Sequence, residues 1–148
     1  MNRYTILFLF FACLLAITAC KPSELNISKT PEIELLDVGP LAVQAFVDSI
    51  SFQIGYTDGD GDLGTNDDTE RNVFIIDNRI EATHAFRLQQ LAPDGAEIPI
   101  RGSFRVSLPN TIITDGSTQQ TVNFTIYVVD RKGRESNQIV TPDIIVSE

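Results

Sequence analysis

The chain has 148 residues, which is about the length of one domain. Its 43% hydrophobic and 21% charged residues are ordinary for a globular protein and exclude a low-complexity or collagen-like chain. With 20 acids and 11 bases the formal net charge is -9, which disfavours nucleic-acid binding because a phosphate backbone would be repelled. The 2 cysteines and 1 histidine are too few for a disulfide framework or a His/Cys zinc site.

The first 19 residues are predicted to be a secretion signal. Arg3 precedes an apolar run over residues 6–17, which is shorter than the ~20 apolar residues of a membrane-spanning helix. The run ends in Ile-Thr-Ala-Cys at positions 17–20, a tetrapeptide that resembles the lipobox of bacterial lipoproteins. The resemblance implies cleavage before Cys20 and attachment of lipid to its thiol. Loss of residues 1–19 would leave 10 bases and 20 acids, a side-chain charge of -10.

A lipidated Cys20 would hold the protein stably on a membrane. Lys21 stands where an aspartate would favour the inner membrane in enteric lipoproteins, so the resemblance implies the outer membrane. The periplasmic and the cell-surface face of that membrane both stay open. Residues 20–31 contain two prolines and no sustained hydrophobic period, which predicts the lipidated cysteine and a flexible tether. The folded domain is expected over residues 32–148.

The domain is predicted to consist of strands, because its apolar residues recur with period two and no window has the period of an amphipathic helix. The predicted strands are residues 32–38, 49–57, 73–76, 86–91, 103–108, 121–128 and 138–146. The continuous apolar run at residues 73–76 predicts a strand covered on both faces. About seven short strands separated by turn residues predict an all-β fold, an antiparallel two-sheet sandwich of immunoglobulin or fibronectin type.

Two motifs carry a further resemblance. An Asp-Gly repeat at residues 58–64 follows an early strand, and an Asp-x-x-Gly hairpin at residues 130–133 is followed by Ser-Asn at positions 136–137. Together with the lipobox, they resemble Bacteroidota lipoproteins that carry a single immunoglobulin-like domain. The resemblance implies the fold and the envelope location but no particular activity.

The acidic segment that follows this early strand is the one candidate metal site. Aspartates at alternate positions with glycines between them could curl around Ca²⁺, which takes six to eight oxygen ligands. The segment is not an EF-hand, because Leu63 stands at the sixth position, where glycine is required. A plain solvated turn rich in Asp and Gly is the alternative, and the sequence leaves both open. The candidate ligands are Asp58, Asp60, Asp62, Asp67 and Asp68.

Other residues with useful chemistry are few. His84 is expected at the surface or in packing rather than as a catalytic base or metal ligand. Tyr127 is the one outward ring that could stack on a sugar, with Arg87 and Arg105 as polar partners, but an ordinary cross-strand contact is favoured. No nucleophile elbow, phosphate-binding glycine loop or His-Glu zinc motif is present, so an enzyme is not expected.

These features together predict a non-catalytic lipoprotein of the cell envelope, a binding or structural module tethered to the outer membrane. Its partner would be an envelope protein or a glycan, and Ca²⁺ is the only cofactor considered. The alternative is a calcium-dependent glycan-binding accessory lipoprotein of a polysaccharide-uptake system. An enzyme ranks third.

Overall fold

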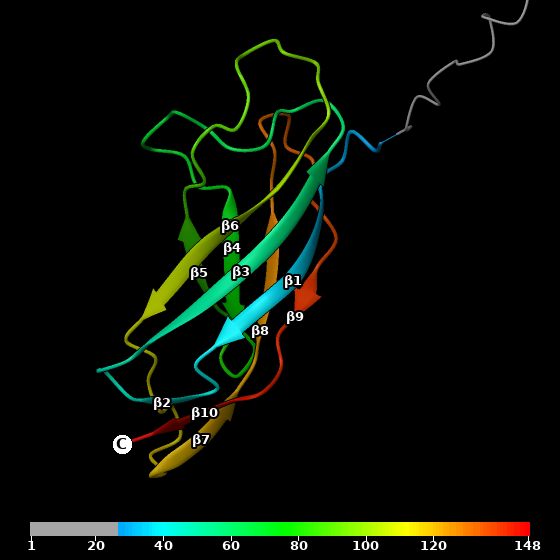
Figure 1. Cartoon of the computed structure of the whole chain (residues 1–148). Coiled ribbons are helices and arrows are strands. Elements are labelled where there is room, and N and C mark those ends of the chain that lie inside the picture. Colours follow the sequence, from blue (N-terminus) through cyan, green and yellow to red (C-terminus); the bar gives the residue numbers. More distant parts are fainter. Residues whose placement is uncertain (1–26) are drawn as a thin grey trace, which may run out of the picture.

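The computed structural model describes residues 27–148, and this part of the chain is all-β (Figure 1). The predicted signal of residues 1–19 and the lipidation site Cys20 lie outside the described residues. Within residues 27–148, no helix is long and apolar enough to cross a membrane. The ten strands of this part are β1 (Glu32–Gly39), β2 (Ala42–Gln44), β3 (Ser49–Asp58), β4 (Val73–Asp77), β5 (Ala82–Phe86), β6 (Ile100–Pro109), β7 (Gln119–Val122), β8 (Phe124–Val128), β9 (Ile139–Val140) and β10 (Ile144–Ser147).

The strands form three sheets, two of which are the layers of a sandwich-like fold. One layer has the order β1–β3–β6 and the other the order β5–β4–β8–β9, with every neighbouring pair antiparallel. The third sheet, β2–β10–β7, pairs β2 with β10 in parallel. In Figure 1 the first layer lies in front of the second, and the small third sheet lies at the bottom.

The core lies between the two layers. Ile50, Phe52 and Ile54 of β3 are fully buried, and so are alternate residues of β8, so each of these strands has one covered face. The rings of Phe52 and Phe124 meet edge to face across the layers with their centroids 5.6 Å apart. Full burial of one such side chain contributes about 1.5–3 kcal/mol. This shared core is the cause of the period-two pattern in the sequence.

The prediction of a strand over residues 86–91 is correct for Phe86 and wrong for the residues that follow it. The strand β5 ends at Phe86, and the backbone that follows binds to the loop before β4 instead of to a neighbouring strand. The N–H of Leu88 donates to Oδ1 of Asn72 at 2.6 Å, and the carbonyl of Leu88 accepts from the N–H of Thr65 at 2.9 Å. A side-chain amide therefore replaces a ladder partner at this point, which hydrophobic periodicity does not reveal.

The last predicted strand, residues 138–146, is divided in two. Its first part is β9, which pairs with β8, and its second part is β10, which belongs to the third sheet. Pro142 stands between them and has no N–H to give to a ladder. Thr141 makes the link to β8, because its N–H donates to the carbonyl of Phe124 and its Oγ1 accepts from the N–H of Phe124.

Burial in β4 also differs from the expectation of a strand covered on both faces. Val73, Ile75 and Asp77 are buried, while Phe74 and Ile76 are only half-buried on the outer face of the layer. The count of about seven strands omits β2 and the divisions after β7 and β9, because strands of two to four residues carry almost no periodic signal.

The two ends of the sandwich differ in what they hold. At one end, the N–H of Gly59 donates to the carbonyl of Ser28 at 2.8 Å, so the start of the described chain lies against the loop that follows β3. We call this the tether end; it lies at the top of Figure 1. The opposite end, with the third sheet and the turns after β2, β4 and β6, is called the far end.

Candidate functional site

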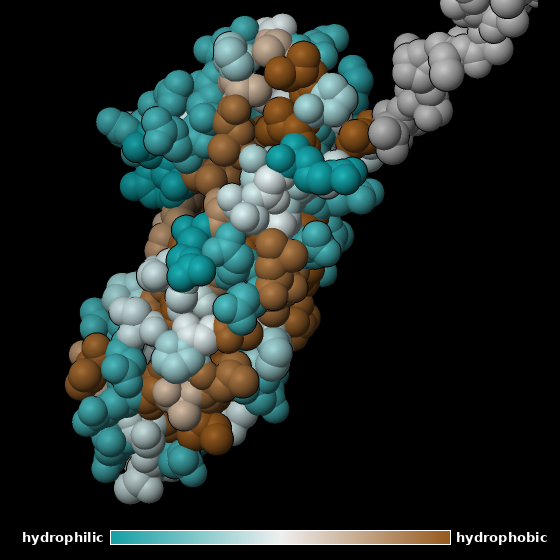
Figure 2. All heavy atoms as spheres, viewed as in Figure 1, coloured by the Kyte–Doolittle hydropathy of each residue, from teal (hydrophilic) through white to brown (hydrophobic). Residues whose placement is uncertain are grey.

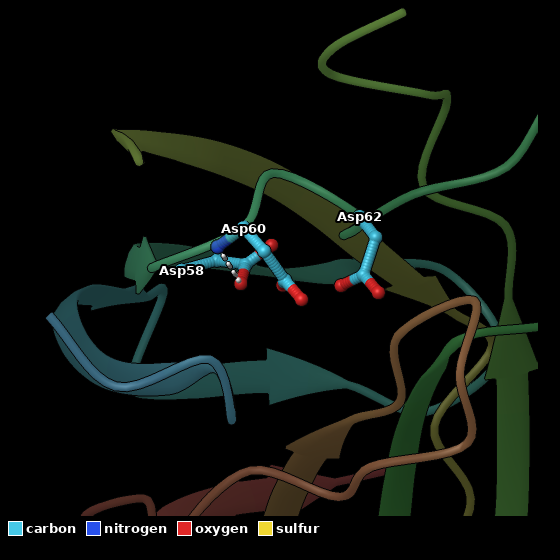
Figure 3. Close-up of side chains that lie close together, drawn as sticks. All are labelled: Asp58, Asp60 and Asp62. Atoms are coloured by element: carbon cyan, nitrogen blue, oxygen red, sulfur yellow. Dashed lines mark hydrogen bonds between the residues drawn. The ribbon is translucent and has the colours of Figure 1, made fainter. Parts of the chain in front are cut away.

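Three aspartates lie close together in the loop after β3. Asp58, Asp60 and Asp62 are all buried, with exposed fractions of 0%, 3% and 6%. One carboxylate oxygen from each lies within 4.8 Å of the others, and Figure 3 shows the carboxylates on one side of the loop. These three residues are called the Asp cluster.

The local chain conformation explains why these carboxylates meet. Asp58 accepts hydrogen bonds from the N–H of Asp60 at 3.4 Å and of Leu63 at 3.0 Å, which folds the loop back on itself. Leu63 is fully buried in the core, which holds the C-terminal part of the loop in place. Gly61 has φ +71, and a Cβ there would lie 2.6 Å from the carbonyl oxygen of Ile98, so the bend requires glycine.

The hairpin between β8 and β9 supplies the positive charge. Nη2 of Arg134 lies 2.8 Å from Oδ1 of Asp60 and 2.8 Å from Oδ2 of Asp62. Nε of the same guanidinium lies 2.6 Å from Oδ2 of Asp130. Nζ of Lys132 lies 2.7 Å from Asp60 and 3.3 Å from Asp62. One guanidinium therefore bridges three carboxylates, and the ammonium binds two of them from the solvent side.

The predicted Asp-x-x-Gly turn is what presents these bases. Oδ1 of Asp130 accepts from the N–H of Lys132 and of Arg134, both at 2.9 Å, and its carbonyl accepts from the N–H of Gly133. Gly133 has φ +78, as the turn requires. Asp130 thus shapes the hairpin backbone and binds the Arg134 side chain at the same time.

Arg131 clamps the hairpin onto the Asp-Gly loop. Its N–H donates to the carbonyl of Asp62 at 3.1 Å, and its guanidinium donates to the carbonyls of Gly61 and Gly64. The loop's backbone is therefore held by one residue of the hairpin and its side chains by two others. This double attachment makes the Asp cluster a rigid part of the tether end.

The acids of the cluster titrate differently because they are neutralised unequally. Burial acts to raise the pKa of Asp60, but hydrogen bonds from Arg134 and Lys132 outweigh it and hold that pKa well below its usual range. Burial raises the pKa of Asp58, which binds only backbone donors. Burial, followed by repulsion from Asp130, raises the pKa of Asp62. Burial therefore disfavours the charged form of two of the three carboxylates, those of Asp58 and Asp62.

The formal charges explain this imbalance. The Asp cluster and Asp130 carry four negative charges, and Arg131, Lys132 and Arg134 carry three positive charges, so one negative charge is left over. An oxygen-only ligand set with excess negative charge fits a hard divalent cation. Because Arg134 and Lys132 already occupy the oxygens of two aspartates, an incoming cation would compete with Lys132, whose side chain is 54% exposed.

A pocket of about 260 Å³ adjoins the cluster on this solvent side. It is lined by Asp60 and Asp62 and, from the loop between β5 and β6, by Asp94 and Glu97. Lys132 and Arg131 also line it, and Nε of Arg131 lies 3.8 Å from Oδ1 of Asp94. A cation in this pocket would therefore meet four acids and two bases, and the buried Asp cluster is the part of the lining that could bind a metal ion.

Asp67 and Asp68, which the sequence grouped with the cluster, are not brought to it. Oδ1 of Asp67 accepts from the N–H and the hydroxyl of Thr69, and the residue is exposed. Asp68 is also exposed and pairs with Arg87 at 3.0 Å. The chain turns outward after Thr65, so the candidate ligand set contracts to three aspartates.

The other residues considered from the sequence do not form a site together. Tyr127 stacks on Phe74 across β4 and β8 with ring centroids 4.9 Å apart, which is the cross-strand contact favoured above. Arg105 lies in the other layer, where it donates to Gln53. His84 is exposed on β5.

The cationic half of the site was missed from the sequence. Its signal was available, because 3 of the 11 bases fall within the four residues 131–134, next to a turn. Neither a scan of protein-family models nor a search of curated proteins or of solved structures finds a match for this chain.

Proposed function

We propose that the protein is a lipid-anchored, non-catalytic binding module of the bacterial cell envelope, held at the outer membrane through Cys20. The observation that carries this proposal is the hydrogen bond from Gly59 to Ser28. It holds Ser28 against the acidic end of the domain, which supports an arrangement in which the chain reaches the domain at that end and the far end is left for a partner. The likeness of the lipobox and of the Asp-Gly repeat to Bacteroidota lipoproteins supports the same compartment.

The strand order supports an immunoglobulin- or fibronectin-like domain. With β1, β3 and β6 as the first, second and fifth strands of such a sandwich, β4, β8 and β9 take the places of the third, sixth and seventh. The parallel pairing of β2 with β10 then joins the first and last parts of the domain. Domains of this architecture serve many functions, so the fold gives the scaffold and not the ligand.

A non-catalytic role is supported by how the described buried charges are used. Asp60 is engaged by Arg134 and Lys132, and at the far end Asp77 pairs with Arg79 at 2.6 Å. A general acid or base needs its titrating atom within hydrogen-bond reach of a substrate. These carboxylates instead hold loops together, as in a structural support for a binding surface.

Lipid attachment is the direct test of the anchor. Cells expressing the full chain are labelled with radioactive palmitate, and the variant Cys20→Ala is compared with Cys13→Ala, which removes the other cysteine. We expect label in the wild type and in Cys13→Ala and none in Cys20→Ala, which should also leave the membrane fraction. Sedimentation of unlabelled Cys20→Ala with membranes would overturn the anchoring proposal.

The second candidate is a calcium-dependent glycan-binding accessory lipoprotein of a polysaccharide-uptake system. The oxygen-only ligand set of the Asp cluster and its one negative charge in excess favour the calcium half of this candidate, and extracellular calcium modules work with affinities of about 10⁻⁴–10⁻³ M. Calorimetric titration with CaCl₂ should then give heat with the wild type and with Asp67→Asn, but not with Asp60→Asn. Glycan binding that survives a chelator would argue against this candidate.

A further inference from the structure

The far end contains a small apolar cavity. It has a volume of about 210 Å³ and opens between the ends of β4, β5 and β6. This is below the ~300–1,000 Å³ of pockets for drug-sized ligands, so it suits a single side chain better than a whole small molecule. Its apolar lining consists of Ile80, Ala82, Leu108, Pro109, Ile112 and Phe124.

Backbone strain is concentrated around this cavity. Phe46, Glu81 and Asn110 are the three non-glycine residues with positive φ in the described part of the chain. Asn110 lines the cavity, Glu81 stands between two lining residues, and the N–H of Phe46 donates to the carbonyl of Thr111, which also lines it. Such strain costs about 1–3 kcal/mol per residue and gathers at binding and catalytic sites.

Thr111 places an unpartnered polar group in the wall of the cavity. Its Oγ1 is the one buried side-chain polar atom among residues 27–148 that has no hydrogen-bond partner. The residue is only 5% exposed and lines the cavity wall. Unsatisfied buried polar groups are rare in folded proteins, and each calls for an explanation.

Large apolar side chains near the mouth of the cavity are exposed to solvent. Phe46 is 73% exposed and Val47 66%, and Ile80 and Ile112, which line the cavity, are exposed as well. Figure 2 shows a small group of apolar atoms at the lower left edge of the domain, where Figure 1 places the turn between β2 and β3. A monomer gains nothing from this arrangement, whereas a binding surface does.

The charge around the cavity defines the partner. The far-end segments are residues 42–50, 77–84, 108–122 and 144–148, and they contain five acids: Asp48, Asp77, Glu81, Asp115 and Glu148. Their one arginine or lysine is Arg79, which Asp77 neutralises, and His84 also lines the cavity. The far end around the cavity therefore carries an excess of negative charge, which attracts a basic segment and repels an acidic one.

We propose that the far-end cavity binds an extended segment of a partner protein that carries one apolar side chain flanked by lysine or arginine. The apolar side chain enters the cavity, and the basic residues lie over the acidic rim. The proposal rests on the proposed function in one respect, since the tether leaves this end free to meet a partner. Its test does not depend on the membrane.

The test uses the full chain in detergent and three synthetic peptides, followed by NMR chemical shifts. The first is Lys-Lys-Ser-Leu-Ser-Lys-Lys; the second replaces Leu by Ser, and the third replaces every Lys by Glu. We expect the first peptide to shift signals of residues 46, 80 and 112 and to bind at least tenfold more tightly than the others. Raising the salt concentration should weaken it.

Matched variants separate the cavity from its surroundings. Ala82→Leu fills the cavity without changing the charge and should weaken the first peptide at least tenfold. Ala85→Leu, which places the same side chain on β5 outside the cavity lining, should leave binding unchanged. Glu81→Lys should weaken binding, whereas Asp67→Lys at the tether end should not.

Several results would overturn the proposal. These are no shifts at about 1 mM of the first peptide, equal binding of the acidic peptide, or equal binding by Ala82→Leu and the wild type. Concentration-dependent shifts at residues 46, 80 and 112 without peptide would assign the cavity to a second copy of the chain. Palmitate labelling of Cys20 reports on the anchor separately, so either proposal can fail alone.

Discussion

Arg134 donates to Asp60 at 2.8 Å and joins two loops that are 74 residues apart in the sequence. Because the same guanidinium also binds Asp62 and Asp130, one side chain connects the end of β3 with the hairpin after β8. The tether end therefore depends on ionic contacts, while the middle of the domain depends on apolar packing.

Removal of the central guanidinium should destabilise the domain strongly. In Arg134→Ala, three carboxylates with side-chain exposures below 10% lose their shared partner, and loss of one member of a buried ion pair costs about 3–5 kcal/mol. Urea unfolding measures the change. Arg87→Ala is the control, because its partner Asp68 is exposed and the effect should be far smaller. Equal losses in the two variants would contradict a special role for Arg134.

Stability should pass through a maximum in mildly acidic solution. The raised pKa values of Asp58 and Asp62 mean that the folded state takes up protons before the unfolded chain does, so stability rises as the pH falls from neutral towards about 4. Below that, the lowered pKa of Asp60 acts oppositely, since the unfolded chain binds its proton first and stability falls.

Melting temperatures between pH 3 and 8 measure this profile. In Asp58→Asn the melting temperature should rise less as the pH falls from 8 to 4, because one of the two carboxyls with a raised pKa is gone. Asp68→Asn removes a negative charge from an exposed position and should leave the shape unchanged. A wild-type melting temperature that rises steadily from pH 4 to pH 8 would show that the excess charge of the cluster has no effect.

Lys132 should act as a competitor of any cation at the Asp cluster. Its ammonium binds both Asp60 and Asp62, so Lys132→Gln should raise the affinity for Ca²⁺ severalfold by removing a positive charge from the ligand oxygens. Calorimetry and the Ca²⁺-induced rise in melting temperature measure the effect, with Lys29→Gln as the control for charge alone. Absence of heat in both the wild type and Lys132→Gln, at millimolar Ca²⁺, would rule out calcium binding.

Two buried threonines should respond oppositely to the same substitution. Thr111→Val removes an unpartnered hydroxyl and should stabilise the protein by about 1 kcal/mol. Thr141→Val removes a hydroxyl that accepts from the N–H of Phe124 and donates to the carbonyl of Pro142, and should cost about 1–3 kcal/mol. Both residues are 5% exposed, so the difference isolates the hydrogen bond. Thermal unfolding in the absence of peptide measures it.

Local sequence determined the strands and half of the site. Alternation of apolar and polar residues predicted β3, β6 and β8, because one face of each strand packs on the core. The alternation of Asp58, Asp60 and Asp62 with glycines predicted that these carboxylates could curl around a cation, with a plain solvated turn as the alternative, and the structure does bring the three together.

Only the tertiary structure decided the rest. Lys132 and Arg134 reach the cluster because β8 lies beside β4 while β3 lies in the facing layer, and no local pattern encodes which loops a sheet order brings to the same end. The outward turn of Asp67 and Asp68 likewise depends on the packing of the loop against residues 88–90. Periodicity reports which face of a strand is buried, whereas contacts between distant loops depend on the closure of the whole sandwich.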